Sequence, residues 1–156
     1  MLQTRRLAVS AIFALALFSG ALLTACGDDE GDSPAEDDAG VLSALSTLDK
    51  AGLHDIDTSI NDKGEVPATA RSTAQKLQTL VALTTWPDEF QGEATALTAI
   101  FADMAKTLDG EKPDTKAAGP AAAKAHDAAH DFADKVWGHL QAKAKVAGAS
   151  AGDHTD

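Results

Sequence analysis

Residues 120–146 carry the sequence PAAAKAHDAAHDFADKVWGHLQAKAKV. The apolar residues of this stretch recur every three or four positions, and alanine, leucine and lysine favour helices, so the pattern predicts an amphipathic helix. Pro120 suits the first turn of such a helix, where the N–H group that proline lacks would have no intrahelical partner. The residues expected on its buried face are Ala122, Ala129, Ala133, Val136, Trp137 and Leu140.

The same periodicity predicts three further helices upstream. Their expected ranges are 41–61, 67–85 and 87–108. Gly64 and Pro67 separate the first two, and Trp86-Pro87 ends the second because a residue before proline is pushed out of the helical region. Gly52 is a point at which the first helix could bend. The expected buried residues are Leu42, Leu45, Leu48, Leu53, Ile56 and Ile60, then Ala70, Thr73, Leu77, Leu80, Val81 and Thr84, then Phe90, Leu97, Phe101, Met104 and Leu108.

Four amphipathic helices with short connections favour antiparallel neighbours. We therefore expect an all-α fold, an up-down-up-down four-helix bundle over residues 41–147. Residues 148–156 are expected to form a disordered tail, since the helical pattern ends near Gly148.

The N-terminus has the parts of an export signal. Arg5 and Arg6 precede an apolar run from Leu7 to Leu23, and small residues follow. The sequence Leu23-Thr24-Ala25-Cys26 resembles the lipobox of bacterial lipoproteins. The resemblance covers the first 26 residues, and it implies that residues 1–25 are a signal peptide and that Cys26 becomes the lipid-modified first residue. The expected location is the cell envelope, anchored to a membrane on its extracytoplasmic side.

Residues 26–40 join this signal to the helical region. They hold seven carboxylates and no basic residue, together with Gly and Pro. Like-charge repulsion and low hydrophobicity keep such a segment extended, so we expect a disordered acidic tether. Because Cys26 is the one cysteine of the chain, its lipidation would leave no disulfide and no thiolate metal site.

Charge and motifs exclude several functions. Without Arg5, Arg6 and the seven tether carboxylates, 11 basic and 17 acidic residues remain, which is unlike the clustered positive charge that nucleic acid demands. The sequence lacks the G-x-S-x-G, H-E-x-x-H, phosphate-loop and dinucleotide motifs. We therefore expect a binding protein and not an enzyme.

His126 and His130 form the most informative pair in the sequence. They lie one helical turn apart, so both rings could bind one metal ion. Glu93 or Met104 of the third helix could complete the site. The simpler interpretation is that these histidines only pack against the core and hydrogen-bond there, and a haem held by Met104 and a histidine is a further alternative.

The neighbouring polar residues carry weaker expectations. His54 would face outward if the first helix were continuous, an orientation lost if Gly52 breaks it. Asp57 is expected to be solvated surface, and Asp131 and Lys135 have the spacing of a helical ion pair.

The preferred prediction is a lipid-anchored, extracytoplasmic helical module that binds an unknown protein or small ligand and requires no cofactor. It would contact the membrane through the lipid on Cys26. The alternative is a carrier or sensor of copper, nickel or zinc that uses His126 and His130, with Glu93 or Met104 as a further ligand.

Overall fold

The protein folds into helices packed around one apolar core. The computed structural model describes residues 34–151, with side chains from Asp38 to Lys145. In chain order its elements are α1 (Pro34–Asp49), α2 (Leu53–Asn61), α3 (Ala70–Leu83), the 3-10 turn η1 (Asp88–Phe90), α4 (Gln91–Thr107) and α5 (Thr115–Ala151). Residues 34–151 contain no strand, so the all-α prediction is confirmed. The expected signal peptide, most of the expected tether and residues 152–156 lie outside the described residues.

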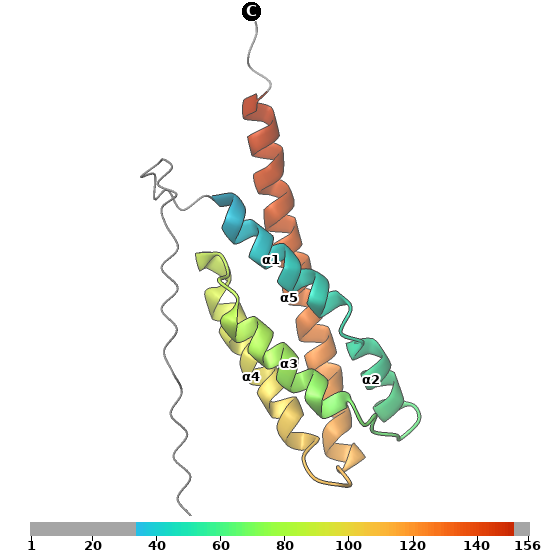
Figure 1. The fold of residues 1–156 in the computed structure, drawn as a ribbon. Helices are drawn as coiled ribbons and strands as arrows, with labels where there is room; N and C mark the ends of the chain where they lie inside the picture. Colours follow the sequence, from blue (N-terminus) through green and yellow to red (C-terminus); the bar gives the residue numbers. More distant parts are fainter. Residues whose placement is uncertain (1–33, 152–156) are drawn as a thin grey trace, which may run out of the picture. The chain divides into compact units, whose positions relative to one another are not determined.

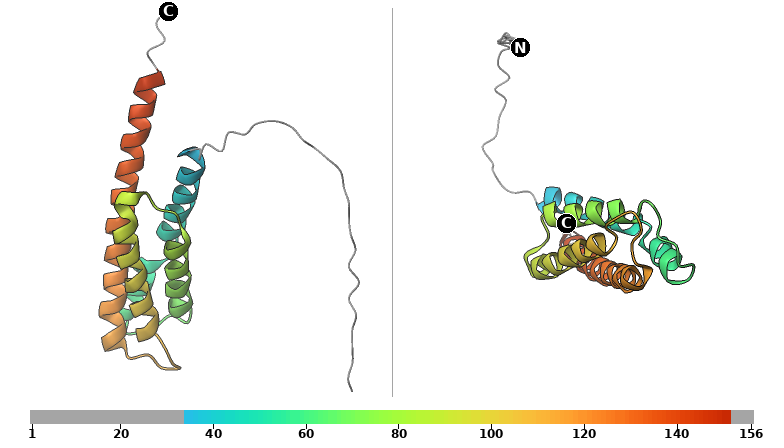
Figure 2. Two further views of the ribbon diagram at one scale, coloured as in Figure 1. Left: turned by 90° about the vertical axis from the view of Figure 1, so that its left-hand side faces the viewer. Right: turned by 90° about the horizontal axis from the view of Figure 1, so that it is seen from below.

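The helices alternate in direction. In Figure 1, α1 and α2 descend as one broken segment, α3 returns, α4 descends and α5 ascends. This is the expected up-down-up-down bundle, with α1 and α2 together in the place of the first helix. The left view in Figure 2 shows that α5 continues past the ends of α3 and α4. Across residues 34–151, no helix combines the length and the apolar character that crossing a membrane would require.

The core is built from alanines and a few large side chains. Alanines line the inner face of α5 at positions 118, 122, 125 and 129, where small side chains allow close helix packing. Phe101 and Met104 of α4 are fully buried, as predicted. The Phe132 and Trp86 rings meet in a T-shaped arrangement with centroids 4.8 Å apart, and Trp86 Nε1 donates a hydrogen bond to the Val81 carbonyl. The buried Trp86 ring therefore has an aromatic packing partner, and its N–H group has a hydrogen-bond acceptor.

Two residues expected in the core are exposed instead. Leu42 is 40% exposed and Trp137 is 39% exposed, whereas Val41 and Phe132 are buried. The apolar stripes of α1 and α5 therefore differ from the prediction at one edge, while Leu45, Leu48, Ala122, Ala129 and Val136 are buried as expected. Local periodicity cannot place a stripe to within one residue when alanine occupies several neighbouring positions.

Several helix boundaries also differ from the prediction, and α3 begins at Ala70 instead of residue 67. α1 begins at Pro34, inside the expected tether, and Asp38 on it bonds to Lys143 of α5 at 2.8 Å. α5 begins at Thr115 because Asp114 caps it, with the Asp114 carboxylate accepting a hydrogen bond from the Lys116 backbone N–H. α5 also continues to Ala151, into the expected tail.

Pro87 does not start the third helix. Its backbone is extended, at ψ 144°, and the 3-10 turn η1 begins at the next residue. Pro87 accepts the first hydrogen bond of that turn through its carbonyl, from the Phe90 N–H at 2.8 Å. Pro87 is therefore the residue that precedes the 3-10 turn. At that position, as in the first turn of a helix, the N–H group that proline lacks would have no partner within the helix.

Gly52 divides the first helical segment in two. Its φ of 70° and ψ of 28° are left-handed, a conformation that glycine adopts without the steric penalty of a Cβ atom. α1 ends just before it, and the Gly52 carbonyl accepts the first hydrogen bond of α2, from the Ile56 N–H. The bend that the sequence allowed is thus a complete break.

Substituting Gly52 tests the importance of this turn. We expect Gly52→Ala to lower the free energy of unfolding by roughly 1–2 kcal/mol, because a left-handed residue with a Cβ is strained. Gly138→Ala is the matched control. Gly138 lies inside α5 with open space around it, so there alanine should stabilise by about 0.5–1 kcal/mol. Chemical denaturation followed by circular dichroism measures both, and equal effects at the two positions would contradict this role of Gly52.

Candidate functional site

A polar stripe runs along α2 beside its apolar face. His54, Asp57 and Asn61 follow one another at intervals of three and four residues, so they share one side of the helix. The buried residues next to them are Leu53, Ile56 and Ile60. Because the buried residues face the core, the polar stripe lies at the boundary between the core and solvent.

A matching stripe on α5 contains Gly119, His126 and His130. Asn61 Nδ2 donates a hydrogen bond to the Gly119 carbonyl at 3.1 Å, and a Cβ atom at Gly119 would clash with the Asn61 side chain. Asp57, one helical turn before Asn61 on α2, contacts His126, which comes after Gly119 on α5. The two stripes therefore run in opposite directions. Glycine at position 119 therefore permits the close approach of α2 to α5.

A carboxylate holds the His126 ring. His126 Nδ1 lies 3.1 Å from Asp57 Oδ2, and these side chains are 16% and 22% exposed. The other carboxylate oxygen of Asp57 accepts a hydrogen bond from Asn61 Nδ2 at 2.6 Å. His126 Nε2 makes no hydrogen bond to a described residue. The ring is thus fixed through one nitrogen, while the other remains available to a ligand.

The His126 ring lies against two other imidazoles, those of His54 and His130. The centroid of the His126 ring is 5.2 Å from that of His54 and 4.9 Å from that of His130. The rings are tilted at 58° and 72°, so neither pair is stacked in parallel. His54 and His130 are exposed and His126 is half-buried. The pair expected from the sequence is therefore a group of three, the histidine cluster His54–His126–His130.

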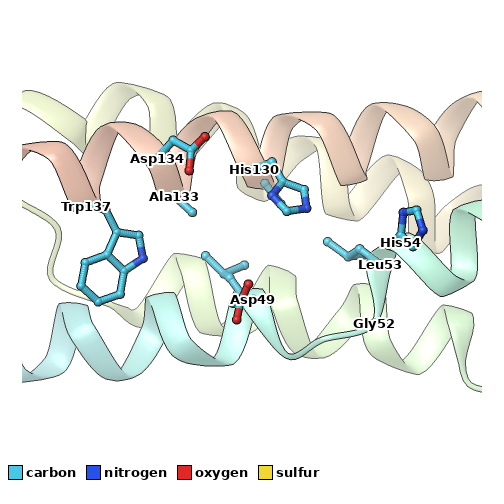
Figure 3. Close-up of a pocket in the computed structure, with 10 residues that line it drawn as sticks. Asp49, Gly52, Leu53, His54, His130, Ala133, Asp134 and Trp137 are labelled. Carbon is cyan, nitrogen blue, oxygen red and sulfur yellow. The ribbon is translucent and has the colours of Figure 1, made fainter.

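A cavity of about 150 Å³ opens beside this cluster. Figure 3 shows His54 and His130 at its wall, Asp49 and Asp134 across from one another, and the Trp137 indole at one end. Its residues come from the end of α1, the Gly52 turn, the start of α2 and the middle of α5. Neither Lys nor Arg lines it, so the charged groups at its wall are carboxylates and imidazoles.

Glu93 and Met104 do not join the histidine cluster. Glu93 Oε1 is paired with Lys135 Nζ at 3.0 Å, and Met104 is fully buried in the core. Lys135 thus pairs across helices with Glu93 and not with Asp131, the partner that spacing within α5 suggested. Cys26 lies outside the described residues.

The donor atoms of the cluster are not converged on one point. Within residues 34–151, no set of three His, Cys, Asp or Glu side chains is already placed to hold a metal ion. A common ligand would need the His54 and His130 rings to turn. Both side chains are exposed, and the terminal torsion of histidine is soft, so the turn requires no repacking of the core.

His54 and Asp57 are the site residues that the sequence analysis did not assign. His54 was expected to face outward on a continuous helix, and Asp57 was expected to be solvated surface. The break at Gly52 brings both to α5. The glycine was the available signal, but the direction that α2 takes after it depends on contacts with α5.

A double-mutant cycle tests the bond between the two stripes. We expect His126→Ala and Asp57→Ala to be coupled by about 0.5–1.5 kcal/mol in the free energy of unfolding, since each removes the same hydrogen bond. His126→Ala with Asp55→Ala is the control, because Asp55 is exposed on α2 and has no bond to a described residue. Urea unfolding of the single and double variants gives both values. A coupling no larger than the control would show that the contact contributes nothing.

Comparisons of this chain with protein-family models, curated proteins and solved structures gave no match. No relative therefore indicates a ligand or an activity. The strongest indication of function among the described residues is the histidine cluster and the carboxylate that holds it.

Proposed function

We propose that this protein is a lipid-anchored, extracytoplasmic module that binds a divalent transition-metal ion through His54, His126 and His130. The observation that carries the proposal is the meeting of three imidazole rings from two helices, with centroids 4.9 and 5.2 Å apart. Metal–nitrogen bonds of about 2.0–2.1 Å place the centroids of two ligating rings roughly 5 Å apart. The two adjacent pairs, His54–His126 and His126–His130, therefore each have a centroid spacing that suits two ligands of one ion.

Asp57 strengthens the proposal. Metal-binding histidines commonly donate their second ring N–H to a carboxylate, which sets the tautomer and orients the ring. The contact from His126 Nδ1 to Asp57 has this form, and it leaves Nε2 for the ion. In this arrangement Asp57 positions His126 and is not itself a ligand.

The lipid anchor rests on the sequence. The run from Arg5 to Ala25 and the lipobox ending at Cys26 support export and lipidation, and acidic residues then lead to the start of α1 at Pro34. Two or more acyl chains, each contributing about 0.8 kcal/mol per buried CH₂, would hold the domain stably on a membrane. The module would thus meet ions outside the cytoplasm.

Removing the Cys26 thiol tests the anchor. We expect Cys26→Ser to abolish incorporation of radiolabelled palmitate in a bacterial host, because the chain contains no other thiol. The wild-type chain, expressed and labelled in parallel, is the positive control. Label retained in the variant would refute lipidation at Cys26.

Single alanine variants test the metal site. In the purified Cys26→Ser chain, with Cu(II), Ni(II) and Zn(II) titrated separately, at least one ion should bind, and His54→Ala, His126→Ala and His130→Ala should each weaken its binding strongly. Asp57→Asn should weaken it about 10–100-fold by releasing His126. Isothermal titration calorimetry measures these affinities. At an ion concentration of 100 Kd, binding should also stabilise the fold by about 2.7 kcal/mol, seen as a raised melting temperature.

His139→Ala is the matched control for these variants. His139 lies on α5 outside the cluster, and its Nδ1 contacts Glu89 Oε1 at 2.6 Å. Its removal should leave metal affinity unchanged. If all four alanine variants behave alike, the ion binds elsewhere on the chain and the proposal fails.

A further inference from the structure

The Trp137 indole lines two neighbouring hollows. One is the cavity of about 150 Å³ beside the histidine cluster, and the other, of about 370 Å³, lies between α1 and α5. Figure 3 shows the indole at one end of the first hollow. Because the two hollows share this side chain, one ligand can contact both of them.

The hollow between α1 and α5 is apolar. Leu42 and Leu140 line it together with Trp137. Leu42 is 40% exposed and Trp137 is 39% exposed, so the fold leaves both partly uncovered. The charged residues at its edge, Asp38 and Lys143, are paired with each other at 2.8 Å. This hollow therefore offers apolar surface to a ligand and no unpaired charge.

The hollow beside the histidine cluster is anionic. Asp49 and Asp134 lie across it from one another, and neither Lys nor Arg lines it (Figure 3). The ion pairs among the described residues involve other carboxylates, so Asp49 and Asp134 have no basic partner there. A cation between them would relieve the repulsion between two like charges. The indole attracts a cation as well, through the negative face of its ring.

From these features we infer that Trp137 and its two hollows bind a small organic ammonium ion that carries an apolar chain. Its charged group would lie against the indole near Asp49 and Asp134, and its chain would cover Leu42 and Leu140. The larger hollow alone reaches the range of about 300–1,000 Å³ that is usual for small-molecule sites. The net charge of −11 would also attract such a cation from a distance. This ligand goes beyond the proposed metal ion, because none of these side chains belongs to the histidine cluster.

Ligands that differ in the charge of their head group test the inference. In the purified Cys26→Ser chain, with EDTA present to remove metal ions, isothermal titration calorimetry compares octyltrimethylammonium with octanol and octanoate below their aggregation limits. The ammonium compound should bind at least about tenfold more tightly than the other two. Tetramethylammonium, which lacks the chain, should bind more weakly than octyltrimethylammonium. Octanoate binding as tightly as octyltrimethylammonium would overturn the inference.

Substitutions separate the two halves of the site. Asp49→Asn with Asp134→Asn should weaken octyltrimethylammonium binding at least about fivefold by removing both charges, and Asp131→Asn should not. Asp131 is the matched control because it is exposed on α5 and lines neither hollow. Leu42→Gln should weaken octyltrimethylammonium but not tetramethylammonium, whereas Leu83→Gln, at a side chain 79% exposed outside both hollows, should change neither. Equal effects of a site variant and its control would contradict this placement of the ligand.

Fluorescence gives an independent readout of where the ligand lies. Octyltrimethylammonium should change the emission of Trp137, and Trp137→Phe should remove this change while Trp86, which is buried against Phe132, still reports the fold. An unchanged emission of Trp137 on saturation would overturn the inference. Metal titrations of the same chain without EDTA test the proposed function separately. Their failure would remove metal binding by the histidine cluster and leave the ammonium site standing.

Discussion

The left-handed turn at Gly52 is the constraint on which the site depends. A helix continuing from α1 at 100° per residue would have carried His54 away from the core. At Gly52 the chain takes a φ of 70°, and α2 starts in a new direction. Its apolar residues then enter the core, and the side of the helix next to them, with His54 and Asp57, comes to face α5. One backbone conformation thus determines both the packing of α2 and the composition of the site.

Small residues on α5 allow α2 to pack closely against it after the Gly52 turn. The inner face of α5 is largely alanine, and Gly119 lets Asn61 approach the backbone so closely that no Cβ could fit there. Interior packing is dense, so a larger residue at such a contact would separate the two helices. The close approach is what allows side chains as short as Asp57 and His126 to meet. The alanine-rich composition is therefore a condition for the polar contacts as well as for the core.

The histidine cluster combines a held ring with two exposed ones. Asp57 and the neighbouring core restrain His126, whereas His54 and His130 stand at the edge of the cavity. Ligands fixed on every side give tight, slowly exchanging sites, and a rigid supporting shell sets their geometry. If the cluster binds an ion as proposed, one restrained ring and two solvent-exposed rings suit reversible capture. That property agrees with a carrier or sensor better than with a structural metal centre.

Sequence periodicity by itself determined that the described part of the chain is helical, where most helices lie and which large residues of α4 are buried, because those features depend on neighbours within one helix. It also identified His126 and His130, which share one turn of α5. It wrongly placed Leu42 and Trp137 in the core and wrongly paired Lys135 with Asp131. These errors arose because the rotation of a helix and the partners of its charged residues are set by the helices around it. Only the tertiary structure decided that His54 and Asp57 meet His126. They lie about 70 residues away along the chain, and the direction of α2 after Gly52 is fixed by burial against α5.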